Sequence, residues 1–249
     1  MTTILVGIDG TGTADDAEYE RQFARSFVHR ICTESPVPAP DRYYTRGPGE
    51  VVSGSDTLHL VHEAVRFIEA RYMYMGTRPG LFSLPSTRTS VLLTGYSRGA
   101  AAVVAVAQVL HDQDIPVKAM MLFDCVDRCP EIDTLTIPSN VDEVIHVSRD
   151  PRTGSRWTFQ NSGRYAHPPT VYNGERIRSP GEEGRIRRFF GTHGAIGGVP
   201  WPVPHGDDPN GHIWEIPDGL THVTYAQDRE CADRIWGEVY PDLCRLGFL

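Results

Sequence analysis

The stretch Ser90–Leu110, SVLLTGYSRGAAAVVAVAQVL, changes character at its centre. Its first part is a β-branched apolar run that predicts a buried strand, and its alanine-rich second part predicts a helix. Between the two parts Gly95 and Gly99 enclose Ser97, so a serine stands where the chain must turn from strand to helix. The stretch therefore predicts an α/β fold and raises the question whether this serine is idle or reactive.

The G-x-S-x-G spacing gains weight from its place at this corner. A nucleophile elbow needs a strained turn directly after a strand, and the two glycines permit both that strain and a close approach of strand and helix. Such a turn points the hydroxyl of Ser97 outward and leaves the backbone amide of Arg98 facing the same spot. The alternative is a glycine-rich turn that carries an unreactive serine.

Apolar runs on both sides of this stretch alternate with helical patterns. Continuous apolar runs are typical of a mostly parallel sheet that is covered by helices on both faces, which is a three-layer α/β architecture. We expect strands at 3–9, 41–44, 88–95, 117–126, 141–147 and 187–190, and helices at 18–31, 55–68, 98–111 and 221–240. Residues 1–249 are expected to form one domain, in which the Gly-, Pro- and Arg-rich stretch 150–217 is an irregular segment over one edge of the sheet.

Composition excludes several classes of function. The net charge of −8 argues against a nucleic-acid partner, and no run of 18 apolar residues could form a transmembrane segment. The start, MTTILVGIDG, lacks the basic region of a signal peptide, and five scattered cysteines without a C-x-x-C pair fit a reducing compartment. We therefore expect a cytoplasmic protein. The sequence leaves open its oligomeric state and export by a route that needs no signal peptide.

A reactive serine needs a histidine base, which a carboxylate must orient. Asp124 ends the apolar run KAMMLFD, where a strand delivers its last side chain to the ligand-binding edge of a sheet. Asp127 follows three residues later and is the rival acid. The alternative for a carboxylate at this place is a helix cap or an ion pair.

Ten histidines compete for the role of base. His193 lies in the glycine-rich loop FFGTHGAIGG after a short apolar run, and His222 is expected at the start of the last helix. The spacing favours His193 only slightly. His146 follows the run VDEVI and is interpreted as a core or edge histidine.

The turn Asp9-Gly10-Thr11-Gly12-Thr13 follows the first expected strand at the same edge. Acyl transfer needs a second backbone donor for the oxyanion, which Gly10 or Thr11 could supply. The turn could equally be a plain β-turn, or the loop of a phosphate- or nucleotide-handling protein. Phosphatases of the haloacid-dehalogenase type carry D-x-D-G-T, and here Gly7 replaces their nucleophilic aspartate.

Six segments together resemble one family in content and order: VGIDGTGT, YYTRGPGE, LTGYSRGAAA, LFDCVD, IHVSRDPRTGSRWTF and FFGTHGAIGG. This is the α/β-hydrolase family that includes the first class of type VI secretion lipase effectors. The resemblance covers most of residues 3–198 and implies an α/β-hydrolase-like fold with a Ser97–Asp124–His193 triad. It implies further that Asp9 and Gly10 lie beside the oxyanion site, and that the pocket floor is shaped by His146, Arg149 and Asp150.

Two departures from the family pattern limit what can be transferred. Ala195 replaces a carboxylate of the histidine loop and Gly12 replaces a tryptophan, and 249 residues leave little room for the membrane-facing segments of larger relatives. The chemistry transfers better than the phospholipid substrate. We expect a serine ester hydrolase of the lipase or phospholipase kind, without a metal or organic cofactor, acting on a small-molecule or lipid ester. The alternatives are a phosphate handler or a non-catalytic interaction protein of the same fold.

Overall fold

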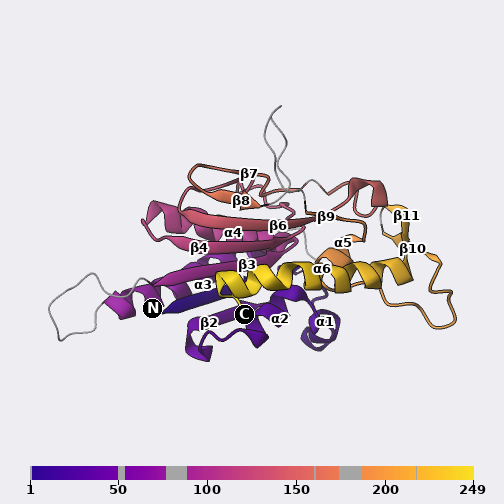
Figure 1. Cartoon of the computed structure of the whole chain (residues 1–249), viewed down its shortest axis with the longest axis horizontal. Helices are drawn as coiled ribbons and strands as arrows, with labels where there is room; N and C mark the ends of the chain where they lie inside the picture. The colour runs from indigo at the N-terminus through magenta and orange to yellow at the C-terminus, as the bar shows by residue number, and fades with distance from the viewer. Residues whose placement is uncertain (1, 50–53, 77–88, 160, 174–186, 217) are drawn as a thin grey trace.

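A parallel sheet runs through the centre of the protein (Figure 1). The computed structural model describes residues 2–49, 54–76, 89–159, 161–173, 187–216 and 218–249. The strand order is β2-β1-β3-β4-β6-β8, with β9 also paired to β6, and every pair is parallel. The strands are β1 (Thr3–Ile8), β2 (Arg42–Thr45), β3 (Ser90–Tyr96), β4 (Val117–Phe123), β6 (Val141–Arg149), β8 (Val171–Asn173) and β9 (Arg188–Phe189).

Helices cover both faces of this sheet because its strands are apolar on both sides. Alternate side chains of β1 enter different cores: Ile4 and Val6 pack with the helices of one face, and Leu5 packs with those of the other. The first face carries α3 (Gly54–Gly76) and α4 (Arg98–Asp112). The second carries α1 (Asp16–Phe23), α2 (Phe27–Glu34), α5 (His193–Ile196) and α6 (Tyr225–Leu246), and Figure 1 shows α6 crossing it. The predicted three-layer α/β architecture is confirmed.

Adjacent strands bring the candidate residues to one edge of the sheet. The registers pair Ile8 with Gly95, Tyr96 with Phe123, and Phe123 with Val147, so β1, β3, β4 and β6 end at similar heights. The residues that follow or end these strands, namely Asp9, Ser97, Asp124 and Arg149, therefore meet at the carboxyl edge. This is where open α/β sheets bind their ligands.

The two glycines of the serine corner are needed for close packing. A Cβ atom on Gly99 would stand 2.1 Å from the carbonyl oxygen of Asp9 and 2.3 Å from that of Ile8. A Cβ atom on Gly95 would stand 2.6 Å from the Cα atom of Ala100. Backbone atoms cannot retreat as side chains do, so only glycine allows α4 to begin this close to β1 and β3.

Two predicted helices are wrong in extent. The expected helix at 18–31 is divided into α1 and α2, because Ser26 takes an extended backbone conformation and its hydroxyl caps α2 through the amide of His29. The expected helix at 221–240 is a strand as far as Thr224, which then caps α6 with Gln227 in a capping box. The helix continues through Pro241 to Leu246.

The segment 150–217 holds only short elements in its described part. These are a 3₁₀ turn (Pro151–Thr153), β7 (Tyr165–Ala166), β8, β9, α5 and β10 (His212–Glu215). β7 pairs with β5 (Thr136–Ile137), and β10 forms an antiparallel hairpin with β11 (Gly219–Thr224). Residues 160, 174–186 and 217 of this segment, and the expected strand start at Arg88, lie outside the described residues. None of the helices in the described ranges is long and apolar enough to span a membrane.

Candidate active site

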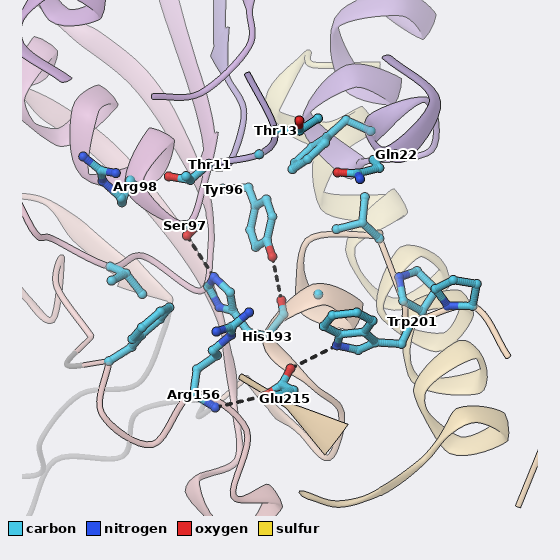
Figure 2. A pocket seen from close by; sticks show the side chains of 18 of the residues that line it. Thr11, Thr13, Gln22, Tyr96, Ser97, Arg98, Arg156, His193, Trp201 and Glu215 are labelled. Carbon is cyan, nitrogen blue, oxygen red and sulfur yellow. Dashed lines mark hydrogen bonds between the residues drawn. The ribbon is translucent and has the colours of Figure 1, made fainter. Parts of the chain in front are cut away.

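Three side chains from distant parts of the chain form a continuous hydrogen-bonded row. His193 Nε2 lies 2.8 Å from Ser97 Oγ, and His193 Nδ1 lies 2.7 Å from Asp124 Oδ2. Figure 2 shows the Ser97–His193 bond at the centre of a pocket. These are the distances that a nucleophile–base pair and its orienting carboxylate require.

Ser97 stands in a strained backbone conformation. It precedes the first residue of α4 with φ 56° and ψ −125°, values that non-glycine residues rarely take. Its neighbours fix this geometry: its amide donates to the carbonyl of Phe123, and its carbonyl accepts from the amide of Val126. Strain held by the surrounding structure in this way is typical of functional sites.

Asp124 is fully buried, and its carboxylate accepts hydrogen bonds from several described donors. Oδ2 accepts from His193 and from the guanidinium of Arg149, while Oδ1 accepts from the side-chain amide of Asn161 at 2.9 Å. Burial alone would raise the pKa of Asp124, but Arg149 and the hydrogen bond from His193 outweigh it and hold this pKa well below its usual range. The carboxylate therefore stays charged at any pH near neutrality.

His193 is held from several sides. Its amide donates to Ser155 Oγ at 2.8 Å, and its carbonyl accepts from the hydroxyl of Tyr96 at 3.0 Å. The preceding Thr192 is bound through its amide and its hydroxyl to the buried carboxyl of Asp228. Burial lowers the pKa of His193, against the attraction of Asp124, so the imidazole is neutral at pH 7. A neutral imidazole whose Nδ1 proton faces Asp124 presents a free lone pair at Nε2 to the serine.

The loop after β1 lies beside Ser97. Asp9 is fully buried, and its carboxyl accepts from Gly10 N at 2.9 Å, from Tyr44 OH at 3.0 Å and from the hydroxyl of Ser26. Burial raises the pKa of Asp9 to about 7, although these hydrogen bonds lower it. The amide of Gly10 is thus already engaged, whereas Thr11 lines the same pocket as Ser97.

Three other predicted residues form no hydrogen bond with Ser97, His193 or Asp124 among the described residues. His222 is exposed in β11 and does not begin the last helix, which corrects that expectation. Asp127 accepts from the amide of Cys129 at 2.9 Å and the hydroxyl of Thr134 at 2.7 Å, so its oxygens are used within its own loop. Asp150 caps the 3₁₀ turn that follows it and pairs with Arg152.

His146 is a core histidine, as its position in a buried strand suggested. Its Nε2 accepts from the amide of Cys125 at 3.2 Å, so its proton is on Nδ1, which lies 3.2 Å from the carbonyl of Gly163. Burial lowers the pKa of His146 to about 4, which keeps the ring neutral. It supports the turn that carries Asp124 without touching Ser97 or His193.

Sequence reasoning missed the residues that hold the row in place. Arg149 was assigned only to the pocket floor, yet it is the ion-pair partner of Asp124 at 2.5 Å. The sequence held a signal for this ion pair. Arg149 and Asp124 are charged residues at the ends of two expected buried strands, and buried charges need partners of opposite sign. Ser155, Asn161 and Asp228 lie in loops or helices whose relation to the serine no local pattern encodes.

The pocket around Ser97 has a volume of about 880 Å³. It is lined by Thr11, Gly12, Thr13, Glu18, Arg21, Gln22, Phe23, Tyr96, Ser97, Arg98, Val126, Arg128, Arg156, Phe159, His193, Gly194, Val199, Pro200, Trp201, Pro202 and Glu215. This is the size of a site for a small organic ligand. Within the described part of the chain, no three His, Cys, Asp or Glu side chains are grouped closely enough to hold a metal ion.

The parallel sheet with helices on both faces and a serine at the corner between β3 and α4 define the α/β-hydrolase fold. Among solved structures the chain is similar to the Tle1 effector bound to the VgrG spike from the Type 6 secretion system, with 17% sequence identity and a TM-score of 0.50. That match covers 82% of this chain and 52% of the effector chain. The likeness concerns the fold.

Two further solved structures match the chain with lower TM-scores. An uncharacterized protein from Pseudomonas aeruginosa matches with 12% identity and a TM-score of 0.48, over 96% of this chain and 46% of that one. A novel cutinase-like protein from Cryptococcus sp. matches with 17% identity and a TM-score of 0.28, over 55% of this chain and 59% of that one. The chain thus spans about half the length of the effector and of the Pseudomonas protein. No protein-family model and no curated protein matches the sequence.

Proposed function

We propose that this protein is a serine hydrolase that cleaves carboxylic esters. The observation that carries the proposal is the row Ser97 Oγ–His193 Nε2, 2.8 Å, and His193 Nδ1–Asp124 Oδ2, 2.7 Å. A serine hydroxyl is a weak nucleophile on its own, and a neutral imidazole with a charged carboxylate behind it removes its proton during attack.

In this mechanism Ser97 attacks the ester carbonyl while His193 accepts the hydroxyl proton. Asp124 stabilises the imidazolium that forms, and His193 then gives the proton to the leaving alcohol. Water repeats the sequence on the acyl-enzyme, which releases the acid and restores the serine. Each step uses only side chains of the row and water.

The oxyanion of the tetrahedral intermediate needs two donors. The amide of Arg98 begins α4, where a helix amide has no partner within the helix. Because the amide of Gly10 is hydrogen-bonded to the carboxyl of Asp9, we assign the role of second donor to the backbone amide of Thr11. Removing one such donor typically costs about 10²–10³ in kcat.

The alternative of a phosphate handler has less support. Its loop would have to present Asp9 to a phosphate or to the metal ion that accompanies it, but this carboxyl is fully buried and bonded to Gly10, Ser26 and Tyr44. Only the sequence resemblance indicates a lipid substrate. We therefore propose an ester substrate and do not assign its acyl chain.

Labelling with a fluorophosphonate, followed by mass spectrometry of the modified peptide, tests the proposal. We expect the label on Ser97 and its loss in Ser97→Ala, together with the loss of 4-nitrophenyl butyrate hydrolysis. Ser90→Ala, which changes a buried serine at the start of β3, the strand that precedes Ser97, is the matched control and should keep both. Absence of labelling in the folded wild type would favour a non-catalytic protein of this fold.

A further inference from the structure

Arginine side chains gather in the Ser97 pocket without ion-pair partners in the described ranges. Four of them line it, Arg21, Arg98, Arg128 and Arg156, and none has a carboxylate of a described residue inside the 4.0 Å that defines an ion pair. Arg21 belongs to α1, whereas the other three directly follow Ser97 or lie against Phe159. The chain as a whole carries a net charge of −8, so this local excess of positive charge runs against its composition. Like charges that lie close together without ion pairs destabilise the folded state by repulsion. Such a cluster therefore calls for a functional explanation.

Aromatic contacts connect two of these arginines with His193 of the hydrogen-bonded row. The guanidinium of Arg128 lies 4.2 Å, and that of Arg156 5.3 Å, from the centre of the Phe159 ring. The same ring meets His193 edge-on, with the ring centres 5.7 Å apart. The Phe159 ring thus contacts both arginines and His193. Among the described residues, the Arg128 side chain forms no hydrogen bond, and that of Arg156 donates one, to the carbonyl of Ile216.

Arg98 directly follows Ser97 in the chain, and its guanidinium extends toward α3. Among the described residues, its Nη2 makes a single long hydrogen bond of 3.4 Å to Thr57 Oγ1, and its buried Nε has no partner. Burial lowers the pKa of Arg98 and nearby Arg128 lowers it further, against the attraction of Cys129, Asp56 and Asp127. The hydroxyl of Thr11, also in this pocket, is another buried atom without a partner. Buried donors left unbonded in the free protein are those that a ligand can satisfy.

The acidic residues of the pocket, Glu18 and Glu215, form no ion pair with these arginines. Glu215 is bonded to the backbone amide of Arg156 and to Trp201 Nε1, each at 3.1 Å, and Glu18 is exposed on α1. The lining also includes the apolar side chains of Phe23, Val199, Pro200, Trp201 and Pro202, next to polar side chains of α1. Figure 2 shows Arg98 and Trp201 on opposite sides of the Ser97–His193 pair.

We propose that the substrate is an acyl ester that carries an anionic group, a phosphate or a carboxylate, on its alcohol side. Arg98, Arg128 and Arg156 bind the anion, and the acyl chain lies against the apolar side of the pocket. Guanidinium groups suit this task because they donate paired hydrogen bonds to such anions. The inference rests on the ester hydrolase proposed above and adds its substrate class.

Two esters that differ only in charge test the inference. 4-(Butyryloxy)benzoate carries a carboxylate on the leaving phenol, and its methyl ester carries none; butyrate release gives kcat/KM for each. Because hydrogen bonds to charged groups are the strong ones, we expect Arg128→Gln to lower the ratio of anionic to neutral kcat/KM by about tenfold. Arg128 is exposed, so this variant should fold, and Arg128→Lys should restore part of the ratio.

Arg21→Gln is the matched control, since Arg21 is an exposed arginine of the same pocket on α1. Removal of this charge should leave the ratio as in the wild type. A ratio that is unchanged in Arg128→Gln, or lowered equally in Arg21→Gln, overturns the inference. Hydrolysis of neither ester would instead overturn the proposed function.

A second pair of substrates distinguishes a soluble anionic ester from a lipid in a membrane. Dibutyryl phosphatidic acid is a soluble monomer, and vesicles of dioleoyl phosphatidic acid in phosphatidylcholine present the same group at a surface. An Arg128-dependent preference for the soluble compound identifies a free anionic ester. The same dependence found only with vesicles identifies a lipid headgroup, and dependence with neither overturns the inference.

Discussion

Arg149 and His193 bind the same atom, Oδ2 of Asp124. Arg149 also donates from Nε to the carbonyl of Ser155 and from Nη2 to those of Arg156 and Phe159. One buried guanidinium therefore fixes both the acid of the proposed triad and the loop that brings Arg156 and Phe159 into the pocket. Loss of Arg149 would affect charge and loop position together.

The first prediction concerns this ion pair. Breaking a buried pair from one side leaves an unpaired buried charge, so Arg149→Met should lower the free energy of unfolding by about 3–5 kcal/mol. Arg149→Lys should not restore it, because an ammonium group cannot reach Asp124 and three carbonyls at once. Urea denaturation measures the loss. Arg152→Lys, with a side chain 82% exposed, is the control and should change little.

The second prediction concerns the strain at Ser97. Glycine adopts φ 56° and ψ −125° without a Cβ clash, so Ser97→Gly should be more stable than Ser97→Ala by about 1 kcal/mol or more, while both lack activity. Thermal unfolding compares them. At Ser90, which lies in β3, the order should reverse, because glycine weakens an ordinary strand. Equal stability of the two Ser97 variants would show that the corner stores no strain.

The third prediction separates the two aspartates. Asp124→Asn should lower kcat by about 10³–10⁴, because an amide neither stabilises the imidazolium nor selects the tautomer of His193. Asparagine tolerates the φ of 42° at this position, but the substitution leaves Arg149 buried without its partner, so the free energy of unfolding should fall as in Arg149→Met. The kcat is therefore measured at a temperature at which far-UV circular dichroism shows that the variant is folded. Asp127→Asn is the matched control and should keep kcat within a few fold of the wild type. A larger loss of kcat in Asp127→Asn than in Asp124→Asn would show that Asp127, and not Asp124, orients the histidine.

The fourth prediction is the pH dependence of turnover. The imidazole acts as a base only when neutral, and burial lowers the pKa of His193 from 6.5. The acid limb of kcat/KM should therefore have its midpoint below pH 6.5, with a plateau above it. A midpoint above 6.5 would mean that attraction by Asp124 outweighs burial.

The fifth prediction is the pH dependence of stability contributed by Asp9. Burial raises its pKa from 3.8 to about 7, so between these values the native state keeps a proton that the unfolded state has lost. Its contribution to stability is present at low pH and decreases as pH rises through this window, by roughly 1.4 kcal/mol per pH unit at most. Asp9→Asn should flatten this slope relative to the wild type in urea titrations.

Local patterns located most of the sheet and its serine corner. β1, β3, β4 and β6 lie within three residues of the expected bounds wherever the structure describes them, because long apolar runs have few ways to be buried. The errors at 18–31 and 221–240 arose where a polar residue caps a helix within a periodic pattern. Ser26 is bonded to Asp9, which lies 17 residues away in the chain, and no helical periodicity reports such a contact.

The sequence by itself determined that a strand–serine–helix corner exists and that Asp124 ends the next strand, since both follow from burial and from glycine's small size. It could only weakly prefer His193 to His222, because either loop could reach the corner. The tertiary structure alone decided that His193 meets Ser97, that Arg149 neutralises Asp124, and that three arginines gather nearby. The reason is physical: strand order and register fix where neighbouring strands end, whereas the position of a loop depends on contacts across the whole fold.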